Sequence, residues 1–239
     1  ILRTWFGRVS GTGLGRAVAS AGFVDADGVP DVIAGGNNGS NIALVFSGAG
    51  GAVIHSLFGD SGVDWFGTSV AGVGDVDGDG FGDVLVGAPQ GFLGPGYARL
   101  FSGADGAQLR QHDGVNTLDL FGWSVTGLGD VDGDGLDDYA IGAPFADNGA
   151  LFNTGRVRAF SGAGGAQLFD RLGDAEDELL GWSVSGRACT NVIAGAPVAR
   201  AGGDAKVLDS GQSGVACGIV SFRPSPLGPL IPLPTRSLR

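Results

Sequence analysis

The sequence predicts an all-β fold made of four copies of one four-stranded antiparallel unit. Glycine supplies 48 of the 239 residues, apolar and polar residues alternate in short runs between glycine-rich turns, and one pattern recurs along the chain. The recurring glycines Gly15, Gly67, Gly122 and Gly181 lie 52, 55 and 59 residues apart. No segment shows the periodicity of an amphipathic helix.

The first half of each repeat is predicted to be a hairpin of two strands, A and B. Residues 66–89 and 121–144 both contain this hairpin, and the two segments match without a gap at 16 of 24 positions. Residues 14–36 follow the same register with more substitutions. Residues 180–197 form a shorter fourth copy that lacks the acidic centre of the turn.

The second half of each repeat is predicted to be another hairpin, of strands C and D. Strand C ends in Phe-Ser-Gly at residues 46–48, 101–103 and 160–162, and its fourth counterpart is residues 218–222. A glycine turn and a further strand-like run follow the first three copies. Four short antiparallel strands are the content of one propeller blade, so the sequence predicts a four-bladed β-propeller.

The two ends of the chain bear on how the propeller closes. Residues 1–7 resemble the strand D at residues 53–59 and are predicted to complete the last blade, giving a closed ring without free sheet edges. The alternative is a strand-swapped or multi-chain propeller. The predicted propeller covers residues 1–222, with repeats near residues 14–59, 66–114, 121–173 and 180–222, and residues 223–239 form a proline-rich tail.

The charge of the chain narrows the classes of partner. Asp and Glu number 25 against 14 Lys and Arg, so the net charge is −11. This balance disfavours nucleic acid and anionic membranes as partners. No run of about 18 apolar residues occurs, so no membrane span is expected.

The turns of the second and third repeats, residues 75–83 and 130–138, both read D-x-D-x-D-G-x-x-D. Four carboxylates within nine residues repel one another unless a hard cation such as Ca²⁺ neutralises them. Gly80 and Gly135 stand where the loop must bend sharply. Solvated acids in ordinary hairpin turns are the alternative. The predicted ligands are the side chains of Asp75, Asp77, Asp79, Asp83, Asp130, Asp132, Asp134 and Asp138, and the backbone carbonyls of Phe81 and Leu136.

The run FG-x-SV-x-G-x-GDVDGDG-x-x-D, followed by Gly-Ala-Pro, resembles the FG-GAP repeats of integrin α-chain propellers and of many secreted bacterial proteins. The resemblance covers residues 1 to about 222. It implies a β-propeller whose A–B loops bind Ca²⁺ and an extracellular or cell-surface setting. Propellers of this family usually close with seven blades, so four repeats are a departure.

The first and fourth repeats depart from the ligand pattern. Phe23 replaces the first acid of repeat one, which leaves a third calcium site open as a weaker one. The shortened turn of repeat four keeps only Asn191 and should bind no metal. The candidate ligands of repeat one are Asp25, Asp27, Asp31 and the carbonyl of Val29.

Cys189 and Cys217 are the two cysteines of the chain. Cys189 falls where the turn of repeat four is shortened, so a disulfide to Cys217 would replace the missing ion as a constraint. Two buried free thiols are the alternative.

No catalytic signature such as G-x-S-x-G or H-E-x-x-H occurs, so we expect no enzyme. His55 and His112 are expected on the outer, exposed strands. The predicted function is a secreted, calcium-binding structural or adhesive module that self-associates through an exchangeable N-terminal strand and C-terminal tail.

The loops between strands B and C lengthen along the chain, on the face opposite the acidic turns. We expect this face to contact an extracellular protein or a glycan. The alternative function is a carbohydrate-binding or carbohydrate-active propeller. It would use tryptophans that we otherwise expect to pack between blades, namely Trp5, Trp65, Trp123 and Trp182. The predicted B–C loops are residues 37–41, 90–95, 145–154 and 198–217.

Overall fold

The computed structural model describes residue 4 and residues 13–36, 41–91, 94–187, 191–197 and 204–209. Every element in this part of the chain is a β-strand, which confirms the all-β prediction. With no helix among them, these residues hold none that is long and apolar enough to cross a membrane.

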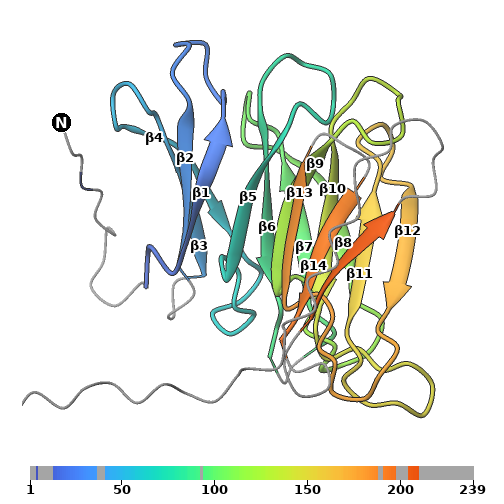
Figure 1. Ribbon diagram of the computed structural model, residues 1–239. Coiled ribbons are helices and arrows are strands. Elements are labelled where there is room, and N and C mark those ends of the chain that lie inside the picture. The colour runs from blue at the N-terminus through green and yellow to red at the C-terminus, as the bar shows by residue number, and fades with distance from the viewer. Residues whose placement is uncertain are drawn as a thin grey trace, which may run out of the picture.

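The strands form four antiparallel sheets that stand side by side, and each sheet follows the order of the chain (Figure 1). The first holds β1 (Ala17–Gly22), β2 (Asp31–Gly36), β3 (Ile42–Phe46) and β4 (Val53–Phe58). The second holds β5 (Ser69–Gly74), β6 (Asp83–Ala88), β7 (Tyr97–Phe101) and β8 (Gln108–Asp113). The third holds β9 (Ser124–Gly129), β10 (Asp138–Ala143), β11 (Arg156–Phe160) and β12 (Gln167–Leu172). The fourth holds, within the described ranges, β13 (Ser183–Arg187), β14 (Asn191–Ala196) and β15 (Asp204–Asp209).

A β-bulge ends the innermost strand of the first three blades. The ladder shifts at Gly22, Gly74 and the Gly129–Asp138 pair, and these glycines have φ angles of 79°, 84° and 73°. A left-handed residue at this point bends the strand into the acidic turn, and glycine adopts it without a Cβ clash. The same local geometry therefore positions each acidic turn.

Neighbouring blades meet mainly through their innermost strands, β1 with β5, β5 with β9, and β9 with β13. A glycine in the second strand of one blade faces a glycine carbonyl of the next. A Cβ placed on Gly87 would lie 2.0 Å from the carbonyl oxygen of Gly122. The hydroxyl of Ser69 donates a 2.8 Å hydrogen bond to that same oxygen. Gly35 and Gly142 make the equivalent close approach to the carbonyls of Gly67 and Gly181.

Apolar side chains fill the space between the sheets. Leu85 of the second blade shares one core with Tyr139 and Ile141 of the third, and all three are fully buried. Phe66 and Phe101 meet edge to face at the junction of the first two blades, with ring centroids 6.1 Å apart. Burial of a side chain of this size stabilises the fold by about 1.5–3 kcal/mol. The cores thus lie between blades rather than within one sheet.

His112 lies at a blade junction, although we expected it on an exposed surface. Its ring stacks on Phe160 with centroids 3.7 Å apart, and its Nε2 lies 2.9 Å from the Tyr139 hydroxyl. Burial, together with the positive charges of the neighbouring Arg158 and Arg110, lowers the pKa of His112 to about 4. The strand position is as expected, but the long side chain reaches inward over the next blade.

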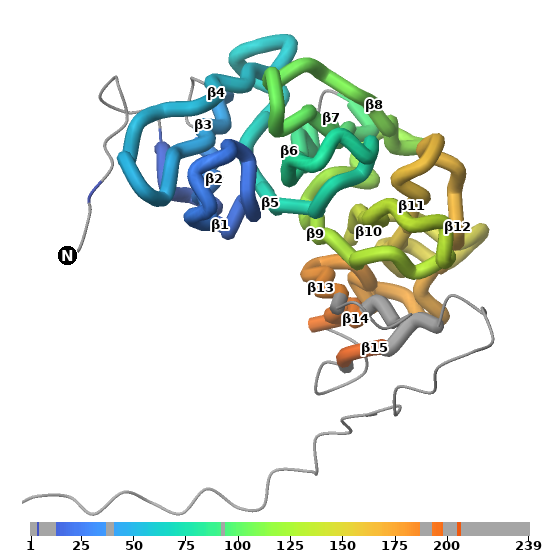
Figure 2. The backbone as a smooth tube through the Cα atoms, turned by 90° about the horizontal axis from the view of Figure 1, so that it is seen from above, coloured from blue at the N-terminus to red at the C-terminus, as the bar shows by residue number. Residues whose placement is uncertain are grey.

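The four sheets form an open arc, so the expected four-bladed closed ring is wrong (Figure 2). The three junctions repeat one glycine-to-carbonyl contact, which turns each blade relative to the last in the same way. Closure of a ring of four blades would need a wider turn at every junction than this shared contact sets. The predicted closing strand, residues 1–7, lies outside the described residues except for residue 4.

The third strand of the last blade is β15, not residues 218–222, which lie outside the described residues. β15 pairs along its whole length with β14. Lys206 on β15 forms a 2.9 Å ion pair with Asp174, as Arg99 on β7 does with Asp60 at 2.5 Å. The sequence prediction missed this strand because it lacks the Phe-Ser-Gly ending. It also overestimated the last B–C loop, which runs from the end of β14 to the start of β15.

Candidate metal centre

Three acidic turns connect the innermost strand to the second strand in the first three blades. Each turn brings three carboxylates together, with one oxygen of each within 4.8 Å of the others. The clusters are Asp75, Asp77 and Asp83 in the second blade, Asp130, Asp132 and Asp138 in the third, and Asp25, Asp27 and Asp31 in the first.

The last acid of each turn is the first residue of the second strand and is buried. Asp83 is fully buried, and its two oxygens accept 2.9 Å hydrogen bonds from the backbone N–H groups of Val76 and Gly103. Asp138 is held in the same way, by N–H groups of Val131 at 2.8 Å and Gly162 at 2.9 Å. This side chain therefore joins the acidic turn to the turn between the third and fourth strands.

The first acid of each full turn shapes the loop around itself. Asp75 accepts hydrogen bonds from the backbone N–H groups of Gly78 at 2.7 Å, Asp79 at 3.1 Å and Gly80 at 2.9 Å. Asp130 accepts the three equivalent bonds at 2.7, 3.2 and 3.0 Å. Two turns that lie in different blades therefore adopt one hydrogen-bonded geometry.

The second and third acids of the full turns differ in whether they belong to the carboxylate cluster. Asp77 is exposed and belongs to the carboxylate cluster. Asp79, which we predicted as a fourth side-chain ligand, is not in that group. Its carboxylate accepts a 2.8 Å bond from the Phe81 N–H and a 3.4 Å bond from the Ser102 hydroxyl. Asp134 is bonded in the same way, and the carbonyls of Phe81 and Leu136 remain predicted ligands.

The clusters suit a hard divalent cation. Burial, with a smaller contribution from nearby carboxylates, raises the pKa of Asp83 and of Asp138 to about 6. The ion pairs found among the described residues involve none of the clustered acids. An all-oxygen site with uncompensated negative charge fits Ca²⁺ or Mg²⁺ rather than a metal that prefers nitrogen or sulfur ligands.

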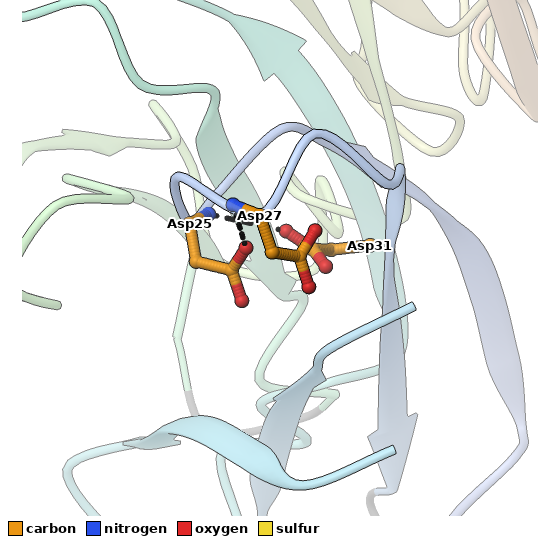
Figure 3. A group of neighbouring side chains, drawn as sticks. All are labelled: Asp25, Asp27 and Asp31. Atoms are coloured by element: carbon orange, nitrogen blue, oxygen red, sulfur yellow. Dashed lines mark hydrogen bonds between the residues drawn. The ribbon is translucent and has the colours of Figure 1, made fainter. Parts of the chain in front are cut away.

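The first-blade turn keeps a three-carboxylate cluster although Phe23 replaces the first acid. Figure 3 shows the side chains of Asp25, Asp27 and Asp31 gathered beneath the turn. Asp31 is buried and accepts N–H groups from Val24 at 2.8 Å and Gly48 at 2.9 Å, like its counterparts. Phe23 is 53% exposed and carries no carboxylate, so it cannot accept the loop N–H groups that Asp75 and Asp130 accept in the other two turns.

Hydrogen bonds also link the acidic turns of neighbouring blades. The Gly82 N–H donates to the carbonyl of Phe23 at 2.8 Å, and the Asp137 N–H donates to the carbonyl of Asp75 at 3.1 Å. In return, the Asp75 N–H donates to the Asp137 carboxylate at 3.0 Å. A cation in one turn would therefore stabilise a blade junction as well as a hairpin.

Sequence reasoning missed the serines that support these turns. Ser47, Ser102 and Ser161 each donate a hydroxyl hydrogen bond to an acid at the same position of the turn in their own blade, namely Asp27, Asp79 and Asp134. The signal was present in the recurring Phe-Ser-Gly, which we interpreted only as a strand ending. Its glycine donates its N–H to the buried last acid of the turn, and its serine donates the hydroxyl hydrogen bond.

The opposite face carries a separate open cleft. It has a volume of about 440 Å³ and lies between the loop before β9 and the B–C loop of the third blade. Asn116, Asp119, Asp147, Phe152 and Asn153 contribute to its lining. Because antiparallel hairpins alternate ends, this cleft and the acidic turns lie at opposite ends of the sheets.

Tryptophans form a half-exposed group on this same face rather than a buried wedge. Trp123 and Trp182 lie with ring centroids 5.0 Å apart, and Phe145 lies 6.3 Å from Trp182. The Trp182 residue is 39% exposed.

Three other sequence predictions fall outside the described residues. These are the Cys189–Cys217 disulfide, the tail at residues 223–239, and Trp5.

Comparison with known proteins agrees with this geometry. The FG-GAP repeat model matches residues 66–101 and 121–160, which contain both full acidic turns. The chain is 32% identical to integrin alpha-4 of Xenopus laevis over 165 residues, 62% of this chain and 16% of that protein. It is 35% identical to integrin alpha-PS2 of Drosophila melanogaster over 149 residues, 55% of this chain and 10% of that protein.

These matches cover a small part of each relative, at most 16% of its length in the two comparisons. Within that part, the repeated hairpins, the equivalent acidic turns and the matched residues coincide. The chain therefore carries FG-GAP repeats in β-propeller-like blades and is similar to part of the integrin α-chains.

Proposed function

We propose that this chain is an extracellular, calcium-stabilised adhesion module without enzymatic activity. One observation carries the proposal: FG-GAP turns gather three carboxylates within 4.8 Å and pair them with no basic side chain among the described residues. The likeness to integrin α-chains supports an adhesive role and a secreted or cell-surface location.

Calcium would act on stability rather than on a reaction. A cation that binds only the folded chain adds RT ln(1 + [Ca²⁺]/Kd), about 2.7 kcal/mol per site at a hundredfold excess over Kd. The two full turns are the stronger sites, because Asp75 and Asp130 already hold their loops in shape. The first-blade turn is the weaker third site.

The contact surface of the module would be the face opposite the cations. Its cleft of about 440 Å³ lies between the loop before β9 and the B–C loop of the third blade. These loops differ between blades, whereas the strands and acidic turns are repeated. Variable loops on a repeated scaffold suit recognition of another protein. The calcium sites would fix the blades that present these loops.

Isothermal titration calorimetry of the chelator-treated protein with CaCl₂ tests the proposal. The parent should show two strong sites, and the Asp77→Ala/Asp132→Ala variant should lose both. Asp105→Ala is the matched control, because Asp105 is an exposed acid in a glycine turn outside the clusters. A parent protein that takes up no calcium, or a double variant that still binds at two strong sites, would overturn the proposal.

A second candidate function, carbohydrate binding, is favoured by the half-exposed Trp123–Trp182 pair with Phe145 beside it. Aromatic faces of this kind stack on sugar rings. A glycan array probed with the parent and with Trp182→Ala separates the two functions. Binding that disappears in Trp182→Ala supports the glycan, and no binding in the parent removes this candidate.

Self-association completes the proposed function, because in the open arc neither end blade has a second neighbouring blade among the described residues (Figure 2). The predicted exchange of the N-terminal strand and the C-terminal tail involves residues outside the described ranges. Side chains of both end blades that lie within the described ranges support a more specific contact.

A further inference from the structure

The face of the first blade that points away from the second blade exposes a residue whose counterparts are buried at the junctions between blades. Val18 on β1 is 67% exposed. Val70 on β5 and Val125 on β9 occupy the same position in the next two blades and are 8% and 9% exposed. Each packs against the blade that precedes it in the chain, and β1 has no such neighbour among the described residues.

The face of the last blade that points away from the third blade exposes the residue whose counterparts pack against this valine at the junctions between blades. Ile193 on β14 is 48% exposed, whereas Ile33, Leu85 and Ala140 at the same position in the other blades are fully buried. Ile33 shares a core with Val70, and Leu85 shares a core with Val125. Ile193 and Val18 are therefore the two halves of a pair that recurs at the internal junctions.

The exposed faces of the first and last blades also carry the two halves of the glycine and serine contacts that join neighbouring blades. A Cβ on Gly67 or Gly122 would meet backbone atoms of the preceding blade within 2.6 Å, whereas one on Gly15 meets nothing within 4 Å. On the other end, Ser69 and Ser124 each donate a hydrogen bond to a glycine carbonyl of the following blade. Their counterpart in the last blade, Ser183, is exposed.

We propose that a second copy of this chain docks head to tail, with Ile193 of the last blade packed against Val18 of the first blade of the next copy. The established interface between blades would then continue across two chains, with Ser183 donating to the carbonyl of Gly15. The proposal deepens the self-association part of the proposed function. The two docking side chains, Val18 and Ile193, belong to none of the carboxylate clusters, although the clustered Asp31 lines the same surface hollow as Val18.

One residue makes this junction looser than the internal ones. Ser20 on β1 stands where β5, β9 and β13 have Gly72, Gly127 and Gly186. A Cβ on Gly72 would lie 2.6 Å from the carbonyl oxygen of Ser20 in the preceding blade. The side chain of Ser20 thus holds an incoming blade slightly away, so the association between copies is reversible and depends on concentration.

Light scattering coupled to size exclusion, over a range of loading concentrations, tests the docking. The parent should exceed the 23.8 kDa of one chain at high concentration and approach it on dilution. Val18→Glu and Ile193→Glu should each remain single chains at every concentration. Both positions are exposed, so these variants should fold. Ser20→Gly should shift the association to concentrations roughly tenfold lower, because it removes the crowding at the junction.

A mixture of the two glutamate variants decides between head-to-tail docking and a symmetric contact. Val18→Glu keeps an intact last blade, and Ile193→Glu keeps an intact first blade. An equimolar mixture should therefore form one-to-one pairs and nothing larger. Val115→Glu, a change at a loop valine whose exposure of 58% lies between those of Val18 and Ile193, is the control and should behave like the parent.

A parent that stays a single chain at all concentrations would overturn the docking, as would a mixture that does not pair. Each measurement is made in calcium and again in chelator, while calcium uptake is measured separately by calorimetry. Failure of association with normal calcium uptake rejects only the docking. Failure of calcium uptake with normal association rejects only the calcium part of the proposed function.

Discussion

Replacement of Asp83 by alanine should destabilise the chain with or without calcium. The two oxygens of Asp83 accept buried N–H groups of Val76 and Gly103, both at 2.9 Å. Hydrogen bonds to a charged group contribute about 1.5–3 kcal/mol each, so their loss costs about 3–6 kcal/mol. Burial opposes the charged carboxylate and raises its pKa to about 6, which places the expected loss near the lower end of that range. A loss of ~3 kcal/mol corresponds to a Tm lower by roughly 6–12 °C for a chain of this size.

Asp77→Ala is the matched comparison, because Asp77 is exposed and accepts only a 3.1 Å bond from the Asp79 N–H in the described structure. Thermal unfolding followed by circular dichroism should place Asp77→Ala within about 0.5 kcal/mol of the parent in chelator. In calcium, Asp77→Ala should fall below the parent because it weakens one site. If Asp83→Ala were as mild as Asp77→Ala in chelator, the buried carboxylate would not hold the two turns together, and our reasoning would be refuted.

Three further predictions concern pH, the first-blade site and the blade junctions. The pKa of His112 is about 4 in the folded chain and about 6.5 in the unfolded chain. As pH falls from about 6.5 towards 4, His112 is therefore protonated in the unfolded chain but not in the folded chain, which favours unfolding. Stability should decline over that window by ~1–2 kcal/mol for this half-buried ring, and chemical denaturation of His112→Leu at the same pH values should show no such decline. Phe23→Asp should strengthen calcium binding at the first-blade turn, so an unchanged calorimetric titration would contradict the assigned weakness. Gly87→Ala places a Cβ 2.0 Å from a backbone oxygen of the next blade and should cost about 1–3 kcal/mol or more, whereas Gly195→Ala meets only its own blade's serine and should unfold near the parent temperature.

The strands of the first three blades could be predicted because the repeats carry local signals. Alternation, β-branched residues and glycine turns mark strands such as residues 83–88 and 138–143 without knowledge of the tertiary structure. Closure of the ring could not be predicted in the same way, because the angle between blades depends on how closely Gly87 approaches Gly122 in space. The strand at Asp204–Asp209 was missed because it lacks the repeat motif and is positioned by the pairing of Lys206 with Asp174.

The acidic turns were predicted from spacing alone, since four carboxylates in nine residues repeat in two copies. Spacing could not show that Asp83 bonds two backbone N–H groups while Asp79 bonds Ser102 outside the cluster. Those contacts arise because the third strand delivers the Phe-Ser-Gly turn to the acidic turn. The side chain of His112 was misplaced for a similar reason, since its strand is outermost but its ring rests on the next blade.

The melting temperature of the parent chain, compared in calcium and in chelator, tests the central claim most directly. If cations neutralise the clustered acids and stabilise the blade junctions, a hundredfold excess over Kd should add about 2.7 kcal/mol for each filled site. The melting temperature should then rise by roughly 5–10 °C for one site and further for two. Superimposable unfolding curves in the two buffers would contradict the account.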